Sequence, residues 1–413
     1  MIRIINAADR GAVATLLSAS RRRDLAVEQT VVRIVESVRL NGDRAVRRHG
    51  RELDGIKGPL EVPRSEWLSA AATLPPPVRR ALQQAATYIR RVARAQRPRG
   101  FRTAVSPGVV VEQRVVPLDR VGCYVPGGRY PLPSSLLMTA IPARVAGVRE
   151  VIAVSPRPHP AILAAALEAG IDRFFRIGGA QAVAALAYGT TTVPRVDKIV
   201  GPGNQWVSAA KALVSRDCAI DFYAGPTEIA IVSIDGGAEW IAADLVAQAE
   251  HDPEARALLI TPNRRLAKEV AVAVRVQAAG NAIALASLAR NGAIIVTRDA
   301  GDAMRLANEL APEHLVVENE AMAREVRAAG SVFVGRWSAQ AAGDYAIGSN
   351  HVLPTAGAAR FRGGLNTADF VRLISVQRLT HQGLARLAPT VTTLARAEGL
   401  EAHARSIEVR TTR

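Results

Sequence analysis

Cysteine is scarce in this sequence, and its scarcity limits the cross-links and metal sites that the chain can form. Only Cys123 and Cys218 occur among the 413 residues, and they do not form a CxxC pair. Two cysteines can build neither a disulfide framework nor a zinc cluster held by thiolates within the chain. Any bound metal must therefore use histidine, carboxylate or amide ligands.

Long apolar segments are also lacking. The N-terminus does not have the basic-then-apolar order of a signal peptide, and no apolar run approaches the roughly 18 residues that a membrane span requires. We therefore expect a cytoplasmic protein with no membrane partner.

Lysine is rare, although the chain is strongly basic with a formal net charge of +16. It occurs only at Lys57, Lys198, Lys211 and Lys268, so arginine supplies most of the positive charge. Basic proteins can bind nucleic acids by neutralising phosphates, and a basic nucleic-acid-binding protein of Rossmann-like fold is one alternative. Because the arginines are scattered over helical stretches and form no single block, we expect no nucleic-acid partner.

From about residue 117 onward, short apolar β-branched runs alternate with alanine-rich stretches of helical period. This rhythm is typical of an α/β protein with largely parallel sheets. The strands are expected at 120–124, 151–154, 174–177, 198–200, 229–234, 258–260, 293–296, 315–317 and 331–334. The helices between them include 134–146, 160–169, 240–251 and 264–279.

The alternation falls into two blocks, at about 119–232 and 233–340, each long enough for one open Rossmann-like sheet. The first hundred residues are expected to be mostly helical. After residue 366, the segments 367–378 and 383–399 both have a helical period but too little apolar material for a domain. We expect an extended C-terminal arm that packs on another structure, such as another subunit.

Polar side chains with catalytic potential occur first in the helix that ends before Pro253. Gln248 and His251 lie three residues apart, so both share one helical face with apolar residues and with Asp244. A hydrogen-bonded core pair and a metal site both account for this spacing. The segment alone favours the core pair.

Adjacent Glu313 and His314 stand where a helix ends, a proline follows and a strand begins. A histidine poised near neutral pH beside a carboxylate can move two different protons, and alcohol oxidation by hydride transfer needs a base. A surface glutamate beside a packed histidine is the alternative for these two residues, and the segment alone favours it.

The segment 343–354 concentrates Gly, Asp, Asn and His after a strand, and the tail adds a further carboxylate and histidine. Asp344 offers a hard oxygen ligand, whereas a plain polar turn is the alternative. His351 lies in the same segment, and Glu398 and His403 lie in the tail.

Three glycine-bearing turns follow strands of the first block, at 124–128, 178–181 and 201–204. Each could bring backbone N–H groups and a polar side chain to a ligand at the carboxyl edge of the sheet. None is the GxGxxG fingerprint, and simple tight turns account for them equally well.

Taken together, these segments resemble the histidinol dehydrogenase family. The resemblance rests on GCYVPGGRYPLPSS, GGAQAVAAL, VGPGNQWVSAAK, DFYAGPTEIAIV, DLVAQAEHDP, APEHL, GSVFVGRWS, AGDYAIGSNHVLPT and EGLEAHARS, in unbroken order from about residue 24 to 410. It implies an NAD-dependent, zinc-dependent oxidation of L-histidinol to L-histidine through L-histidinal, at the end of histidine biosynthesis.

The resemblance also implies roles for individual residues. The acid–base residues would be Glu313 and His314. One zinc ion per subunit would be held by Gln248, His251, Asp344 and His403. Substrate would be bound by Thr227, Gln248, His251, His314, Asp344, His351, Glu398 and His403, and NAD would be bound by Tyr124, Gln181 and Asn204.

Members of the family are homodimers in which the C-terminal arm of each chain reaches the partner's site. The resemblance therefore implies a division of this chain into domains and arms. We expect an N-terminal arm over 1–23 and a discontinuous substrate and zinc domain over 24–118 with 233–365. An NAD-binding domain over 119–232 and a dimerisation arm over 366–413 complete the division.

One residue and one segment depart from the sequence pattern of the family. Thr227 stands where some members have serine, which keeps the hydroxyl group and adds a methyl group, and the segment 361–366 also differs from the commoner forms. The alternative within the family is a dehydrogenase of another small polar alcohol, such as sulfopropanediol.

Overall fold

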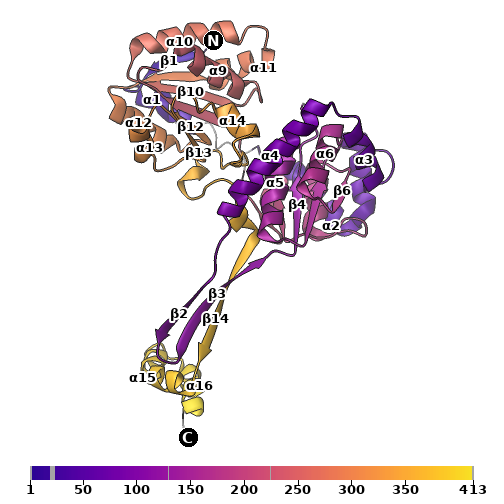
Figure 1. Ribbon diagram of the computed structural model, residues 1–413, viewed down its shortest axis with the longest axis vertical. Coiled ribbons are helices and arrows are strands. Elements are labelled where there is room, and N and C mark those ends of the chain that lie inside the picture. Colours follow the sequence, from indigo (N-terminus) through magenta and orange to yellow (C-terminus); the bar gives the residue numbers. More distant parts are fainter. Residues whose placement is uncertain (1, 19–23, 129, 224, 412–413) are drawn as a thin grey trace.

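The computed structural model describes residues 2–18, 24–128, 130–223 and 225–411. Two globular parts and one long arm make up the chain (Figure 1). Each globular part is a parallel β-sheet covered by helices on both faces, so the α/β class expected from the sequence is confirmed. No helix in the described part is long and apolar enough to cross a membrane.

The first globular part is built on a five-stranded parallel sheet. Its strands, in spatial order, are β6 (Arg173–Phe175), β5 (Glu150–Val154), β4 (Arg120–Tyr124), β7 (Lys198–Val200) and β8 (Ala219–Ile220). One face is covered by α3 (Arg64–Ala72), α4 (Pro76–Ala95), α5 (Pro133–Ala146) and α6 (Pro160–Ala169). The other face is covered by α2 (Leu25–Asp54), α7 (Gly179–Tyr188) and α8 (Gln205–Val214).

The second globular part is built on a six-stranded parallel sheet. Its strands, in spatial order, are β1 (Arg3–Asn6), β11 (Ala293–Val296), β10 (Arg256–Thr261), β9 (Glu228–Val232), β12 (His314–Val317) and β13 (Ser331–Val334). One face is covered by α9 (Ala238–Ala249), α10 (Arg264–Gln277) and α11 (Ala282–Asn291). The other face is covered by α1 (Arg10–Ser18), α12 (Ala300–Leu310) and α13 (Glu320–Glu325).

The arm is an antiparallel three-stranded sheet that ends in two helices. Its elements are β2 (Phe101–Ser106), β3 (Val109–Pro117) and β14 (Val371–Leu379), followed by α15 (His381–Ala397) and α16 (Glu401–Thr411) at the tip. Its base is fixed where Phe370, in the short helix η3 (Thr367–Phe370), is buried in the core and Lys198 Nζ donates to the Asp369 carbonyl at 2.8 Å.

The expected arm and N-terminus differ from the structure in two respects. The segment 371–379, expected to be helical, is strand β14, because the arm gives it a partner in β3 over its whole length. The segment 1–23, expected to be an arm, carries edge strand β1, which pairs with β11, and Leu16 of α1 is buried in the core. Residues 1 and 19–23 of that segment lie outside the described residues.

The expected division into domains also differs from the observed packing. Helices α2, α3 and α4, which we assigned to the domain of 233–365, cover the five-stranded sheet and supply much of its two cores. Strand β9, which we assigned to the domain of 119–232, pairs with β10 and β12 of the six-stranded sheet. Apolar faces of helices bury against the nearest sheet, and the sequence pattern does not say which sheet that is.

Candidate active site

The expected acid–base pair lies at the amino-terminal edge of the six-stranded sheet. His314 is the first residue of β12, which runs between β9 and β13, and its register partner on β9 is Ile229. Glu313 and His314 are both buried. Ligands of open α/β sheets usually lie at the carboxyl edge, so this placement is unusual for such a fold.

Glu313 is held by a short chain of hydrogen bonds. Its Oε2 accepts the backbone N–H of Glu228 at 2.8 Å and the hydroxyl of Thr227 at 2.5 Å. Thr227 Oγ1 in turn accepts from Gln248 Nε2 at 2.6 Å, at the end of α9. The structure thus brings together Thr227, Gln248 and Glu313, which the sequence places far apart.

His314 has one nitrogen fixed and one open. Its Nδ1 lies 3.2 Å from the Glu228 carbonyl, which accepts a hydrogen bond when that nitrogen carries the proton. Its Nε2 is buried and has no hydrogen-bond partner in the described part of the chain. The imidazole can therefore accept a proton at Nε2.

Burial shifts the two ionisation equilibria in opposite directions. Burial raises the pKa of Glu313 to about 8, although the hydrogen bonds from Thr227 and Glu228 oppose that shift. Burial lowers the pKa of His314 to about 4, because the imidazolium ion loses its hydration. In this environment Glu313 is a carboxylic acid and His314 a neutral base near neutral pH.

Asp344 and His351 complete the same side of the site. Asp344 lies in α14 (Gln340–Tyr345), with its Oδ1 3.7 Å from His314 Nε2 and 4.0 Å from His351 Nδ1. Its Oδ2 accepts from Gln340 Nε2 at 2.7 Å. His351 Nε2 lies 3.0 Å from the hydroxyl of Ser135, which reaches the site from α5.

Four residues of this site were not anticipated from the sequence: Glu228, Phe333, Gln340 and Ser135. Glu228 orients both acid–base residues through its backbone and is itself anchored by Arg256, whose Nη1 lies 2.9 Å from Glu228 Oε2. Phe333 packs its ring 6.1 Å from that of His314. Glu228 directly follows Thr227, which could have signalled it, whereas Ser135 and Gln340 carry no local signal.

Of the other expected ligands, one lies beside the site and two lie far from it. His251 lies just beyond the end of α9, is exposed, and is close enough to His314 and His351 to interact electrostatically with both. Glu398 caps the end of α15 and His403 lies in α16, both at the tip of the arm and far from α9 and α14 of the same chain (Figure 1). Within the described part of one chain, no three His, Cys, Asp or Glu side chains are grouped to hold a metal.

The expected cofactor residues lie at the carboxyl edge of the five-stranded sheet. Tyr124 ends β4, Gln181 is in the first turn of α7, and the side chain of Asn204 caps α8 by accepting from the backbone of Trp206 and Val207. The Tyr124 hydroxyl accepts from the Gly179 N–H at 3.1 Å.

Glycine brings the backbone close to this edge. Gly201 has a φ of 116°, and a Cβ there would lie 2.2 Å from the Tyr124 carbonyl oxygen, so a larger residue does not fit. Gln181 is fully buried and donates to Asp54 Oδ2 at 2.9 Å, and its Oε1 has no hydrogen-bond partner among the described residues. Asp54 also lines a cavity of about 340 Å³ together with Lys57, Arg157 and Arg176.

The fold and the site define an α/β protein with a buried carboxyl–imidazole pair that is suited to proton transfer. A family model for histidinol dehydrogenase matches residues 17–411. The histidinol dehydrogenase of Nitrosomonas europaea is 46% identical over 412 residues, which cover 96% of this chain and 95% of that protein. The Thermus thermophilus enzyme of that name is 48% identical over 396 residues, covering 94% and 95%.

A solved structure agrees with these relatives. The crystal structure of histidinol dehydrogenase from Elizabethkingia anophelis matches with a TM-score of 0.93 at 31% identity, and covers 99% of this chain and 98% of that one. The chain therefore belongs to the histidinol dehydrogenase family.

Proposed function

We propose that this protein oxidises L-histidinol to L-histidine through L-histidinal, with NAD as the hydride acceptor in both steps. The observation that carries the proposal is the buried pair of Glu313 and His314, which holds two proton-transfer groups in opposite states near neutral pH. Membership of the histidinol dehydrogenase family supports the choice of substrate. The alternative, a dehydrogenase of another small polar alcohol such as sulfopropanediol, has no support among these relatives.

His314 serves as the base for the first oxidation. Its Nδ1 faces the Glu228 carbonyl, so the proton is held on that side of the ring and the Nε2 lone pair faces the site. As the carbinol carbon gives up its hydride, Nε2 takes the hydroxyl proton, and the product is the aldehyde.

Glu313 serves the second oxidation. Once ionised, its carboxylate takes a proton from water as the water oxygen adds to the aldehyde carbon, and protonated His314 returns its proton to the aldehyde oxygen, which gives the hydrate and leaves His314 neutral. The hydrate then loses a second hydride while His314 again accepts a hydroxyl proton. The hydrogen bonds from Thr227 and from the Glu228 N–H hold the carboxyl group in place through both steps.

The residues present fit a zinc ion at this site. Gln248 Oε1 is buried and has no hydrogen-bond partner in the described part of the chain, as expected for an oxygen atom that binds a metal ion. Asp344 Oδ1 lies 3.7 Å from His314 Nε2. We propose Gln248, His251 and Asp344 as ligands, with His403 as the fourth. When bound, zinc would supply a Lewis acid that positions the nitrogen atoms of the substrate.

His403 must then come from a second copy of the chain. The arm carries α16 away from the site of its own chain, so a ligand at residue 403 reaches a zinc site only in a partner. We propose a homodimer in which the partner's arm also supplies Glu398 for substrate binding. This arrangement explains why one chain alone does not assemble a complete ligand set.

The residues at the carboxyl edge of the five-stranded sheet fit a dinucleotide. Tyr124, Gln181 and Asn204 would contact NAD, and the unpartnered Oε1 of Gln181 offers an acceptor there. The cavity beside Asp54 carries Lys57, Arg157 and Arg176, whose positive charge suits the diphosphate group. When bound, NAD accepts the hydride.

The test is an assay of NADH formation with L-histidinol at mildly alkaline pH, using zinc-loaded protein. The proposal predicts two NADH molecules for each L-histidinol consumed and L-histidine as the product by mass spectrometry. Folded, zinc-loaded protein that forms NADH from other small diols and not from L-histidinol would contradict it.

A further inference from the structure

A pocket of about 400 Å³ lies between three helices that cover the five-stranded sheet. None of its lining residues belongs to the acid–base site or to the proposed cofactor edge. Its walls are formed by arginines of α4, α5 and the segment after α4, over apolar side chains of α5 and α6: Arg90, Arg94, Arg97, Arg144, Ile141, Val145 and Ala169.

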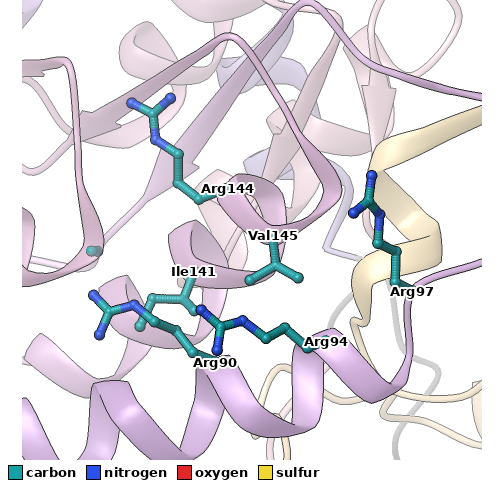
Figure 2. A pocket seen from close by; sticks show the side chains of 7 residues that line it. Arg90, Arg94, Arg97, Ile141, Arg144 and Val145 are labelled. Atoms are coloured by element: carbon teal, nitrogen blue, oxygen red, sulfur yellow. The ribbon is translucent and has the colours of Figure 1, made fainter.

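The arginines approach the pocket from different sides (Figure 2). Arg90 and Arg94 project from the same face of α4, one turn apart, over Ile141, whereas Arg144 projects from α5. Arg97 lies beyond the last turn of α4. Positive charge therefore surrounds an apolar floor.

Two of the arginines are held in place by the end of α6. Arg144 Nε donates to the Gly170 carbonyl at 2.7 Å, and its guanidinium is paired with Asp172. Arg90 donates to the Glu168 carbonyl. These contacts satisfy helix-terminal carbonyls and give this wall a defined shape before any ligand arrives.

The other two arginines have uncompensated charge. Over residues 2–18, 24–128, 130–223 and 225–411, the guanidinium groups of Arg94 and Arg97 form no hydrogen bond or ion pair. Both side chains are exposed. The two nearby carboxylates offset two of the four arginine charges: Asp172 pairs with Arg144, and Glu168, whose Oε1 accepts from the neutral amide of Gln83 at 3.3 Å, keeps its negative charge beside the pocket. Two positive charges thus remain for a ligand.

From this geometry we infer that the pocket binds a small phosphate ester, with its phosphate on Arg94 and Arg97 and its apolar part on Ile141 and Val145. A phosphate dianion matches the two uncompensated charges, and the guanidinium fork donates to two phosphate oxygens at once. A volume of about 400 Å³ suits a small metabolite, whereas nucleic acid would require a continuous basic track.

Phenyl phosphate is a suitable probe, because it carries one phosphate and one apolar ring and competes little for zinc. Its binding to the dimeric, zinc-loaded protein would be measured by isothermal titration calorimetry, with inorganic phosphate in a parallel titration. The variant is Arg94→Gln with Arg97→Gln. The matched control is Arg91→Gln with Arg99→Gln, which removes the same charge from exposed positions outside the pocket.

We expect phenyl phosphate to bind about tenfold more tightly than inorganic phosphate, and the pocket variant to lose about tenfold or more of that affinity. The control variant should bind within about twofold of the unmodified protein. Turnover of L-histidinol, measured on both variants, reports whether they are folded. Equal binding by the two variants, or no binding of phenyl phosphate by the unmodified protein, would overturn the inference.

Discussion

At the scale of single residues, the site depends on where each proton is held. The Glu228 backbone contacts both proposed catalytic groups, because its N–H donates to Glu313 and its carbonyl faces His314. The backbone of one residue thereby fixes the relative position of two side chains whose pKa values lie at about 8 and about 4. Hydrogen bonds of this kind set the tautomer of a catalytic histidine.

Replacement of His314 tests its role as the base. We predict that His314→Asn lowers turnover by about a hundredfold or more, while zinc content and the affinity for L-histidinol change little. Asparagine can still donate to the Glu228 carbonyl, but it has no nitrogen lone pair to take the hydroxyl proton. Steady-state kinetics and metal analysis give the result, and turnover within about threefold of the unmodified enzyme would exclude this role.

Replacement of Glu313 separates the two oxidations. Glutamine cannot ionise, so Glu313→Gln should slow oxidation of supplied L-histidinal more than the first hydride transfer from L-histidinol. The two half-reactions are measured separately in single-turnover experiments. Equal losses in both would argue against Glu313 as the group that activates water.

The pKa values give this assignment a pH signature. Since burial raises the pKa of Glu313 to about 8, the carboxylate is scarce at pH 7, and histidinal oxidation should speed up as pH rises through 8. The pKa of His314 is lowered to about 4, so its neutral form is present throughout that range. The rise with pH should disappear in Glu313→Gln.

Only part of the site could be predicted from the sequence, because the fold brings together residues that lie far apart along the chain. Adjacent Glu313 and His314 stand at a local pattern, a proline-stopped helix followed by a strand, but that pattern alone favoured a surface glutamate beside a packed histidine, and family resemblance supplied their roles. The contact between Ser135 and His351 joins positions 216 residues apart, and no local pattern reports it. Family resemblance supplied the roles of Gln248 and Asp344, for which the local pattern alone favoured a core pair and a turn.

At the scale of elements, the helices and strands of the two parallel sheets follow from their apolar pattern. Strands β4 to β7 and β9 to β13 all occur where short apolar runs predict them. Strands that are buried on both faces have continuous β-branched sequence, which makes such runs easy to recognise. The edge strands β1 and β8 and the strands of the arm were missed. In β14, 371–379, most side chains are exposed, so its conformation depends on pairing with β3 and not on burial.

Close packing of α14 against β13 positions Asp344, because Gly343 of α14 lies against Phe333 of β13. A Cβ at Gly343 would lie 2.7 Å from the Phe333 ring, and that ring packs on His314. We predict that Gly343→Ala displaces the ring or α14 and lowers turnover by about tenfold, while the circular dichroism spectrum is unchanged. The control Gly363→Ala, where no atom lies within 4 Å, should keep its activity. Equal activity of the two variants would refute this role.

At the scale of the whole molecule, the metal and the fold should be separable. Gln248 lies at the end of α9 and His251 just beyond it, and the apolar side chains of this helix are buried in a hydrophobic core that includes neither residue. Asp344 lies outside both cores of the six-stranded sheet. We predict that chelator-treated protein keeps its circular dichroism spectrum and loses turnover, and that added zinc restores turnover. Undiminished activity in protein shown to be free of metal would rule out a catalytic zinc ion.

The arm raises the main question about the whole molecule, which is where Glu398 and His403 act. Figure 1 places α15 and α16 at the end of the arm, remote from β12 and α14 of the same chain. A two-fold dimer in which each arm completes the partner's site would bring all the proposed ligands together. This shared site is the central claim of our account.

Complementation between two inactive variants tests that claim most directly. His314→Ala chains and His403→Ala chains are unfolded together and refolded as an equal mixture, so that about half of the dimers contain one of each. In such a dimer, the intact core of the His403→Ala chain receives the intact arm of the His314→Ala chain, while the other site carries both lesions. We predict recovery of about a quarter of the unmodified activity, because half of the dimers have one working site of two. A mixture no more active than its two parents, with mixed dimers detected by native mass spectrometry, would contradict the shared site.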